Sequence, residues 1–406
     1  MNDTQELATS IVRRLKEAGH TAFFAGGWVR DLLMGHPSDD IDIATSASPE
    51  EVVALFPRTV QVGIAFGVVV VLLEGHQFEV ATFRKDIDYQ DGRKPTRIEA
   101  ADPEQDALRR DFTINGMFYD PLTDTVIDYV GGRRDIEHQM IRTIGHPFER
   151  FFEDRLRMIR AVRFACRFGF HIDPETQKAI YGAAQTLFPA VSIERVWQEF
   201  VKMSQYPQFD YALVEMHRLG LLPIIFPTLD GVHLTEIKER VAHFHRMPKE
   251  TPTFAYLLAL FPDLSDEAIE DLGRYLKVPR REVKFCLFIR ECQRLSNPDS
   301  YQWAKIYAHP EALTAFEILA APLSDEEGRT SLLAHQERMQ ALAPHIRRAQ
   351  EKKTLLTSEH LKEAGIKPGK EMGDLLREGE KLTVEYNLEC PKEVLKKLRE
   401  KWRSAP

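Results

Sequence analysis

The stretch Gly26–Thr45, GGWVRDLLMGHPSDDIDIAT, decides how the first part of the chain folds. Two adjacent glycines follow the apolar run TAFFA, and two aspartates, Asp40 and Asp42, flank one isoleucine. In an extended strand, side chains two residues apart point to the same face. The stretch therefore predicts a strand, a glycine turn, a short helix and a second strand with two carboxylates on one face. Because neighbouring like charges repel, we expect a positive group between them.

The composition is that of a globular chain with several domains. Its 406 residues exceed one ordinary core, which predicts two to four domains. The four cysteines form no CxxC pair, so we expect free thiols in a reducing compartment. The N-terminus lacks the apolar core of a signal peptide, and no stretch approaches the roughly 18–20 apolar residues of a membrane span. We therefore expect a cytoplasmic protein without membrane contact.

Charge is distributed unevenly along the chain. The net charge of −8 argues against a protein that coats nucleic acid non-specifically. The segment 150–167 is different, because it contains six arginines and only two acidic residues. This local clustering keeps RNA open as a partner.

The apolar patterns predict an α/β head followed by helices. Ser48 and Glu51 form a capping box that opens a helix. Residues 66–84 are typical of two strands joined by a short turn. From Glu153 onward, amphipathic helical patterns continue to the C-terminus, and strand signals nearly vanish.

The aspartate pair is a candidate metal site. Hard divalent cations such as magnesium prefer oxygen ligands, and Asp40 and Asp42 supply two carboxylates on one strand face. Glu79 completes the set if its strand lies beside the strand of the pair. Taken alone, the pair also fits an acidic strand end.

The glycine pair is a candidate phosphate cradle. Gly26 and Gly27 lie between a strand and a helix, so their backbone N–H groups can approach a phosphate closely. Arg30 lies one helical turn further on and can contact the same anion. The stretch matches neither G-x-G-x-x-G nor a Walker loop, which excludes the fingerprints of dinucleotide-binding and P-loop proteins.

At these residues the chain resembles the class II tRNA nucleotidyltransferases, which comprise the CCA-adding enzymes and bacterial poly(A) polymerases. The resemblance implies a polymerase-beta-like head with a small mixed sheet, with Asp40, Asp42 and Glu79 as catalytic residues and Mg2+ as cofactor. The segment RRDFTING, Arg109–Gly116, resembles the second motif of this family. By resemblance, three of its polar residues contact the ribose: Arg110, Asp111 and Asn115. Gly116 departs from the alanine that is common in the family.

The segment EDRLRMIRAVRF, 153–164, resembles the family's nucleotide-selecting motif. On one helix Asp154, Arg157 and Arg160 would share a face, and Glu153 would pair with Arg157 four residues later. The resemblance implies that Asp154 and Arg157 read the base, that Glu153 orients Arg157, and that Arg160 and Arg163 assist nucleotide binding.

Three further segments resemble family elements more loosely. DYVGGRRDI, 128–136, reads either as a hinge between head and neck or as a plain turn. SIERVWQEF, 192–200, is expected to buttress the selecting motif through Glu194 and Arg195. SEHLKEAGIKPGKEMGDLL, 358–376, resembles a tail that holds the tRNA elbow. We therefore expect a head over 1–140, a neck over 141–205, a body over 206–340 and a tRNA-binding tail over 341–406.

The resemblance implies template-independent addition of CCA to the 3′ end of tRNA from CTP and ATP. The segment TFRKDIDYQDGRKP, 82–95, resembles the flexible loop that permits the switch from CTP to ATP, which disfavours a CC-adding enzyme. An A-adding enzyme and a bacterial poly(A) polymerase remain alternatives. An inactive RNA-binding relative would lack the aspartates, and a small-molecule nucleotidyltransferase would not need the selecting motif. The sequence leaves the oligomeric state open.

Overall fold

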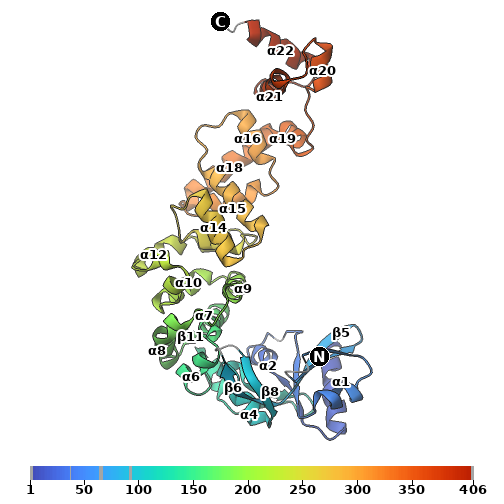
Figure 1. Ribbon diagram of the computed structural model, residues 1–406, viewed down its shortest axis with the longest axis vertical. Coiled ribbons are helices and arrows are strands. Elements are labelled where there is room, and N and C mark those ends of the chain that lie inside the picture. The colour runs from blue at the N-terminus through green and yellow to red at the C-terminus, as the bar shows by residue number, and fades with distance from the viewer. Residues whose placement is uncertain (1–2, 37, 64–66, 91–93, 404–406) are drawn as a thin grey trace. The chain divides into compact units, whose positions relative to one another are not determined.

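The computed structural model describes residues 3–36, 38–63, 67–90 and 94–403 (Figure 1). The chain divides into two compact units, Met1–Glu239 and Arg240–Pro406. The expected head and neck both fall within the first unit. The finer division into four parts stays a prediction.

A seven-stranded mixed sheet forms the centre of the head, in the order β3-β4-β5-β2-β1-β8-β9. Strands β2 and β5 run parallel, and all other neighbours are antiparallel. This arrangement confirms the predicted fold class. The strands are β1 (Ala22–Ala25), β2 (Asp42–Thr45), β3 (Thr59–Gly63), β4 (Val68–Leu73), β5 (His76–Thr82), β8 (Met117–Asp120) and β9 (Thr125–Asp128).

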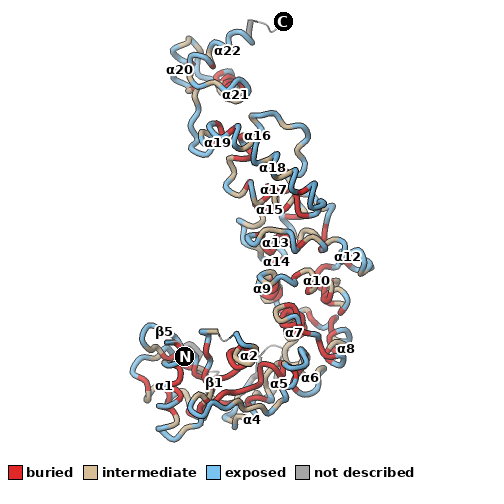
Figure 2. Tube along the Cα trace, turned by 180° about the vertical axis from the view of Figure 1, so that it is seen from behind, coloured by how far each residue is buried: buried red, intermediate tan, exposed pale blue. Residues whose placement is uncertain are grey.

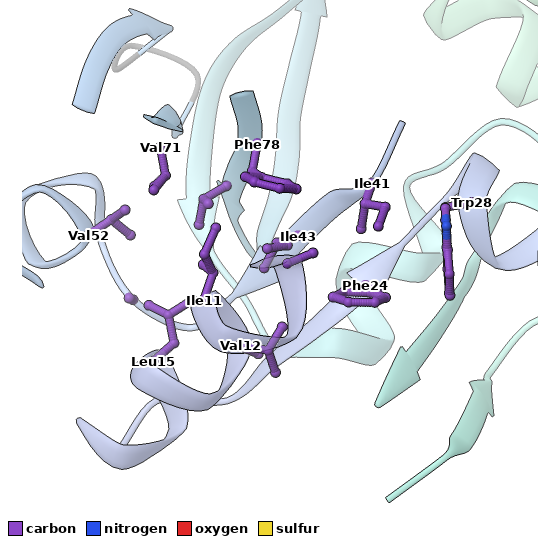
Figure 3. Close-up of a cluster of buried hydrophobic side chains, with 14 of the residues drawn as sticks. Ile11, Val12, Leu15, Phe24, Trp28, Ile41, Ile43, Val52, Val71 and Phe78 are labelled. Carbon is purple, nitrogen blue, oxygen red and sulfur yellow. The ribbon is translucent and has the colours of Figure 1, made fainter. Parts of the chain in front are cut away.

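One face of this sheet is covered by α1 (Asp3–Glu17) and α3 (Pro49–Leu55). Figure 3 shows Ile11 and Leu15 of α1 with Phe24 and Ile43 of the sheet in this buried cluster. Ser48 caps α3 in the predicted capping box. Because side chains alternate along a strand, burial of Ile43 on this face leaves Asp42 on the other.

The other face carries the predicted site residues. Ile43 pairs with Val80 in the β2–β5 ladder, so Asp42 and Glu79 lie side by side on neighbouring strands, as expected. A separate two-stranded sheet, β6 (Arg84–Gln90) and β7 (Lys94–Ala100), leads into α4 (Pro103–Leu108). These two strands correspond to the expected flexible loop, whose residues 91–93 lie outside the described part of the chain.

The chain between the sheet and the end of the first unit is mainly helical. A one-turn 3-10 helix, η2 (Thr113–Asn115), lies inside the second motif. The other elements are α2 (Gly27–Leu33), α5 (Gly132–Glu137), β10 (Met140–Ile141), α6 (Pro147–Glu153), α7 (Leu156–Phe168), β11 (His171–Ile172), α8 (Pro174–Ala183), η3 (Ala184–Thr186), α9 (Ile193–Met203), α10 (Phe209–Arg218), α11 (Leu221–Ile225) and η4 (Pro227–Leu229), with α12 (Leu234–Val241) at the unit boundary.

The predicted helix over 153–164 is wrong at its start. Helix α6 ends at Glu153, Asp154 has an extended backbone (φ −146°, ψ 105°), and α7 begins at Leu156. The carboxylate of Asp154 accepts a hydrogen bond from the Leu156 backbone N–H at 3.1 Å. An aspartate that caps the following turn in this way competes with helical continuation.

The second unit is helical throughout its described residues. A buried cluster that includes Leu361, Leu375 and Val394 holds the last three helices together. Figure 2 shows which stretches of the chain are buried. None of the described helices is long and apolar enough to cross a membrane. The elements are η5 (Phe244–Arg246), α13 (Thr253–Leu258), α14 (Asp266–Leu276), α15 (Arg280–Gln293), α16 (Ser300–Tyr307), α17 (Ala312–Ala320), α18 (Asp325–Ala341), α19 (Ala343–Gln350), α20 (Ser358–Glu363), α21 (Lys370–Glu385) and α22 (Pro391–Arg403).

The DYVGGRRDI segment is a tightly hydrogen-bonded turn. The Asp128 carboxylate accepts bonds from the backbone N–H groups of Val130, Gly131, Gly132 and Arg133 at 2.9–3.0 Å. This ties the start of α5 to the end of β9. The plain-turn interpretation therefore describes the segment well.

Replacing Gly132 with alanine should destabilise the first unit. A Cβ atom there would lie 2.3 Å from the Thr113 carbonyl oxygen and 2.9 Å from Met117, so the backbone must shift. Overpacking of this kind costs about 1–3 kcal/mol, which thermal unfolding would detect. Gly373→Ala is the control, because that helical glycine has no neighbouring atom within 4 Å. Equal melting temperatures for wild type and Gly132→Ala would contradict the packing argument.

Candidate functional site

A cavity of about 720 Å³ in the first unit gathers the motifs. Eight arginines and five aspartates line it, so its wall is positively charged overall. Such a wall suits a polyanionic ligand. The lining residues are Gly26, Gly27, Trp28, Arg30, Asp31, Ser38, Asp40, Asp42, Arg109, Arg110, Asp111, Asn115, Asp154, Leu156, Arg157, Arg160, Arg163, Phe164, Arg167 and Arg195.

The aspartate pair occupies one end of this lining. Asp40 and Asp42 are exposed and alternate with buried Ile41 and Ile43, as the strand pattern predicted. The pKa of Asp42 is raised to about 6, first because surrounding protein displaces its water and then because Asp40 and Glu79 carry the same charge. Arg110 opposes this rise.

Glu79 does not complete a metal cluster in this structure. It lies on the neighbouring strand but does not line the cavity. Within residues 3–36, 38–63, 67–90 and 94–403, no group of three or more carboxylate, histidine or cysteine side chains is close enough to hold a metal ion. The assignment of Glu79 as a third catalytic carboxylate therefore rests on its strand position and on its electrostatic effect on Asp42, and it stays a prediction.

Gly26 allows the positive group to approach the aspartates. Its φ of +69° is a conformation that glycine adopts readily. A Cβ atom at this position would lie 3.0 Å from Arg110 Nη1 and 4.0 Å from Asp42 Oδ2. Arg110 is therefore a cation near Asp42, whereas the expectation of a positive group between the two aspartates stays a prediction.

Asp106 of α4 holds Arg110 in place, and the sequence analysis did not identify it. Its buried carboxylate pairs with Arg110 at 3.0 Å and with Arg109 at 2.7 Å. It also accepts a bond from the backbone N–H of Arg84, at the start of β6. The spacings of three and four residues on one helix are a signal that could have identified it.

The guanidinium of Arg30 lies beneath the glycine turn. A Cβ atom on Gly27 would lie 3.4 Å from Arg30 Nη2. The group is 3% exposed, pairs with Asp31 at 2.7 Å and donates to Asn115 Oδ1 at 2.6 Å. Arg30 thus lines the predicted phosphate cradle, but Asp31 and Asn115 already accept hydrogen bonds from its guanidinium group and orient it.

Asp111 and Asn115 join the head to the neck. Arg160 Nε donates to Asp111 Oδ2 at 2.9 Å, and Asn115 Nδ2 donates to Asp111 Oδ1 at 3.0 Å. Burial by itself would raise the pKa of Asp111, but Arg160, Asn115 and Arg157 hold it well below its usual range. Asp111 is therefore ionised at neutral pH, and its carboxylate accepts the hydrogen bonds that hold Arg160 and Asn115 in place.

Arg157 has its expected partner despite the break in the helix. Its Nη1 pairs with Glu153 at 2.6 Å, and its Nη2 donates to the Arg109 carbonyl at 3.3 Å. Glu153 itself does not line the cavity, which agrees with an orienting role. Asp154 pairs with Arg195 of α9 at 3.1 Å, the contact expected of the buttressing motif.

The structure differs from the expectation at Arg163. This residue lines the cavity, yet its guanidinium forms a buried pair with Glu199 of α9. Arg163 is therefore mainly a link between α7 and α9 in this structure. Glu199 was not identified, because nothing in local spacing connects residues 36 positions apart.

Twelve of the fourteen predicted site residues thus line one cavity, and Glu79 and Glu153 are not part of its lining. The sequence analysis missed several lining residues. Of these, Asp31 and Arg167 form an ion pair at 3.2 Å. The arginine cluster pointed to Arg167, whereas no pattern pointed to Asp31 as its partner.

Comparison with known proteins agrees with this geometry. The family model of the poly A polymerase head domain matches residues 22–142. The model described as the probable RNA and SrmB-binding site of polymerase A matches residues 169–232. The CCA-adding enzyme of Enterococcus faecalis is 34% identical over 409 residues, which cover 98% of this chain and 96% of that relative.

Two solved structures are similar in fold. The crystal structure of the Bacillus stearothermophilus CCA-adding enzyme in complex with CTP is 28% identical, has a TM-score of 0.81, and covers 100% of both chains. The Thermotoga maritima CCA-adding enzyme complexed with tRNA is 20% identical and has a TM-score of 0.65. That match covers 99% of this chain and 96% of the other, and it shows a shared fold.

Proposed function

This chain belongs to the CCA-adding enzyme family, and from that premise we propose that it adds CCA to the 3′ end of tRNA. The reaction uses CTP twice and ATP once and releases pyrophosphate at each step. In each step a bond forms between the 3′ oxygen of the RNA and the α-phosphorus of the nucleotide. The bond to the pyrophosphate group breaks at the same phosphorus. tRNA and both nucleotides are cytoplasmic, so we place the reaction there.

One observation supports the proposal above the others. A single cavity holds the aspartate pair of the head together with Asp154 and Arg157, the proposed base readers. A polymerase without a template needs its reacting groups and its base-selecting groups in one place. In the proposed roles, Gly26, Gly27 and Arg30 hold the triphosphate. Arg110, Asp111 and Asn115 form the ribose wall, where Asp111 already anchors Arg160.

Family membership implies dependence on a divalent metal, and we propose Mg2+ at Asp40 and Asp42. The donor set fits, because Asp42 at the start of β2 and Asp40 two residues before it are accessible carboxylates that line one cavity, and Mg2+ prefers such oxygen ligands. A bound metal would lower the pKa of the attacking hydroxyl and neutralise charge on the triphosphate. The protein's own contribution is to hold the nucleotide in line with the RNA terminus.

Removal of divalent metal should stop incorporation. Excess EDTA is expected to reduce addition of labelled CMP to background, while tRNA binding measured by filter retention stays unchanged. Magnesium added in excess of the chelator should restore addition. Incorporation that persists in EDTA would contradict the metal assignment.

We also propose that the helical part after the neck holds the tRNA. Residues 206–340 would form the body, and 341–406 a tail that contacts the elbow. The tail carries exposed lysines, including Lys362, Lys367 and Lys370, that can meet phosphates.

Three tRNA transcripts test the proposed function. They end before CCA, after C and after CC, and each is incubated with Mg2+ and with CTP, ATP or both. Growth of the first by three nucleotides, and then a stop, is the expected result. Extension of only the CC-ended transcript by one A would indicate an A-adding enzyme. Long A tails would indicate a poly(A) polymerase.

A further inference from the structure

A chain of polar side chains, connected by ion pairs and hydrogen bonds, runs from α7 through the head and back to α7. Arg167 Nη2 pairs with Asp31 Oδ2 at 3.2 Å, and the other oxygen of Asp31 pairs with Arg30 at 2.7 Å. Arg30 then donates to Asn115, Asn115 donates to Asp111, and Arg160 donates to Asp111. We name this set the relay; in order, its members are Arg167, Asp31, Arg30, Asn115, Asp111 and Arg160.

Both ends of the relay lie on α7. Arg160 and Arg167 are seven residues apart, which is about two helical turns, so they lie on the same side of the helix. A helix held at a single point can still tilt and swing about that point. Attachment at two points two turns apart sets both its position and its direction relative to the head. Arg157, the proposed base reader, is one turn from Arg160 on this helix.

Asp31 is the member on which the relay depends most. It is 7% exposed and lies between two guanidinium groups, each of which binds one of its oxygens. The pKa of Arg30 is lowered, first by burial and also by the nearby charge of Arg167. Without the Asp31 charge, these two arginines would lose the carboxylate that lies between them, and the more distant Asp111 would be the remaining negative charge acting on Arg30.

The surroundings of Arg30 reinforce this link. Its guanidinium lies 4.6 Å from the Phe168 ring centre and 5.5 Å from that of Phe164, both on α7. The two rings stack with an interplanar angle of 4°. Arg30 of the head is therefore seated against α7, and Asp31 holds it there.

We propose that Asp31 is a positioning residue whose carboxylate sets α7, with the base reader Arg157, against the strand that bears Asp40 and Asp42. This inference rests on the proposed function. Asp31 need not touch the nucleotide, since it acts through Arg30 and Arg167. Its loss should therefore impair both nucleotide binding and the choice among nucleotides.

The variant Asp31→Asn tests the proposal, because it keeps the side-chain volume and removes the charge. We expect kcat/KM for CTP and ATP to fall by about 10- to 100-fold, in line with the cost of a small misplacement of reacting groups. Most of the loss should come from KM. Misincorporation of UTP and GTP relative to CTP should rise, because α7 no longer holds Arg157 in one position.

The control is Glu215→Gln, which breaks a carboxylate–arginine pair of similar burial in the same unit. Glu215 of α10 is 8% exposed, pairs with Arg218 at 2.6 Å, and does not line the cavity. This variant should lower the melting temperature without changing KM or nucleotide choice. If Asp31→Asn changes only the melting temperature, as this control does, the positioning role is wrong.

A double variant tests the route through Arg167. Arg167→Gln alone should raise KM, and adding it to Asp31→Asn should cost much less than the product of the two single effects. Fully multiplicative effects would overturn the coupling. In all these measurements, each variant is compared with the wild-type enzyme acting on the same three transcripts. A wild type that adds no nucleotide refutes the proposed function, whereas an active wild type with unchanged Asp31→Asn kinetics refutes only this inference.

Discussion

Asp42→Ala should reduce nucleotide incorporation by at least about 1,000-fold, since the loss of one metal-holding carboxylate removes several kcal/mol of transition-state stabilisation. Asp40→Ala should have a similar effect, because Asp40 and Asp42 are both exposed and line the same cavity. Affinity for tRNA should stay unchanged. Single-turnover addition of CMP to a transcript lacking CCA, together with a tRNA binding assay, would measure both quantities.

Asp39→Ala is the matched control for these variants. Asp39 is an exposed carboxylate next to Asp40 in the chain, but it does not line the cavity. It should retain activity close to that of wild type. Substantial turnover in Asp42→Ala, or an equal loss in Asp39→Ala, would remove the metal assignment.

Arg157→Ala should weaken the discrimination among CTP, ATP, UTP and GTP. We expect the ratio of kcat/KM for CTP to that for UTP to fall by on the order of 100-fold. Sites that recognise a ligand through placed hydrogen-bonding groups discriminate strongly, and they lose this ability when the groups are removed. Glu153 and the Arg109 carbonyl orient the Arg157 guanidinium in advance. The ratio of kcat/KM for CTP to that for UTP, on a transcript lacking CCA, would measure the effect.

Arg155→Ala provides the comparison for this experiment. Arg155 immediately precedes the same helix, but it stacks on exposed Phe152 and does not line the cavity. Its loss should leave nucleotide choice intact. A proportional loss for all four nucleotides in Arg157→Ala would show that Arg157 supports catalysis without selecting the base.

The local features of the head could be predicted because short-range rules govern them. The alternation around Ile41 and Ile43 placed Asp40 and Asp42 on one face, and the capping box at Ser48 formed as expected. The position of Glu79 beside Asp42 was also correct as a matter of strand order. Local periodicity could not show whether Glu79 reaches the cavity, because that depends on what covers each face of the sheet.

One expectation failed where local and long-range contacts compete. Helical spacing favoured one continuous helix through Asp154, but its carboxylate caps the next turn and pairs with Arg195. Gly116, at a position where alanine is common in the family, shows a second effect of long-range packing. In this structure a Cβ atom there would lie 2.7 Å from Val130 and 2.9 Å from Ile144, so the glycine is a packing requirement.

By itself, the sequence determined the succession of elements from the first helix to β2 and α3, the glycine turn, the side-chain alternation around the aspartate pair, and the arginine-rich segment that meets it. These features depend on residues that are only a few positions apart, and the side-chain periods of strands and helices decide which of those residues share a face. Only the tertiary structure decided the distant partners that orient the site: Glu199 for Arg163, and Arg167 for Asp31. Asp31 and Arg167 are 136 positions apart, and the folding of the whole unit brings their charges together.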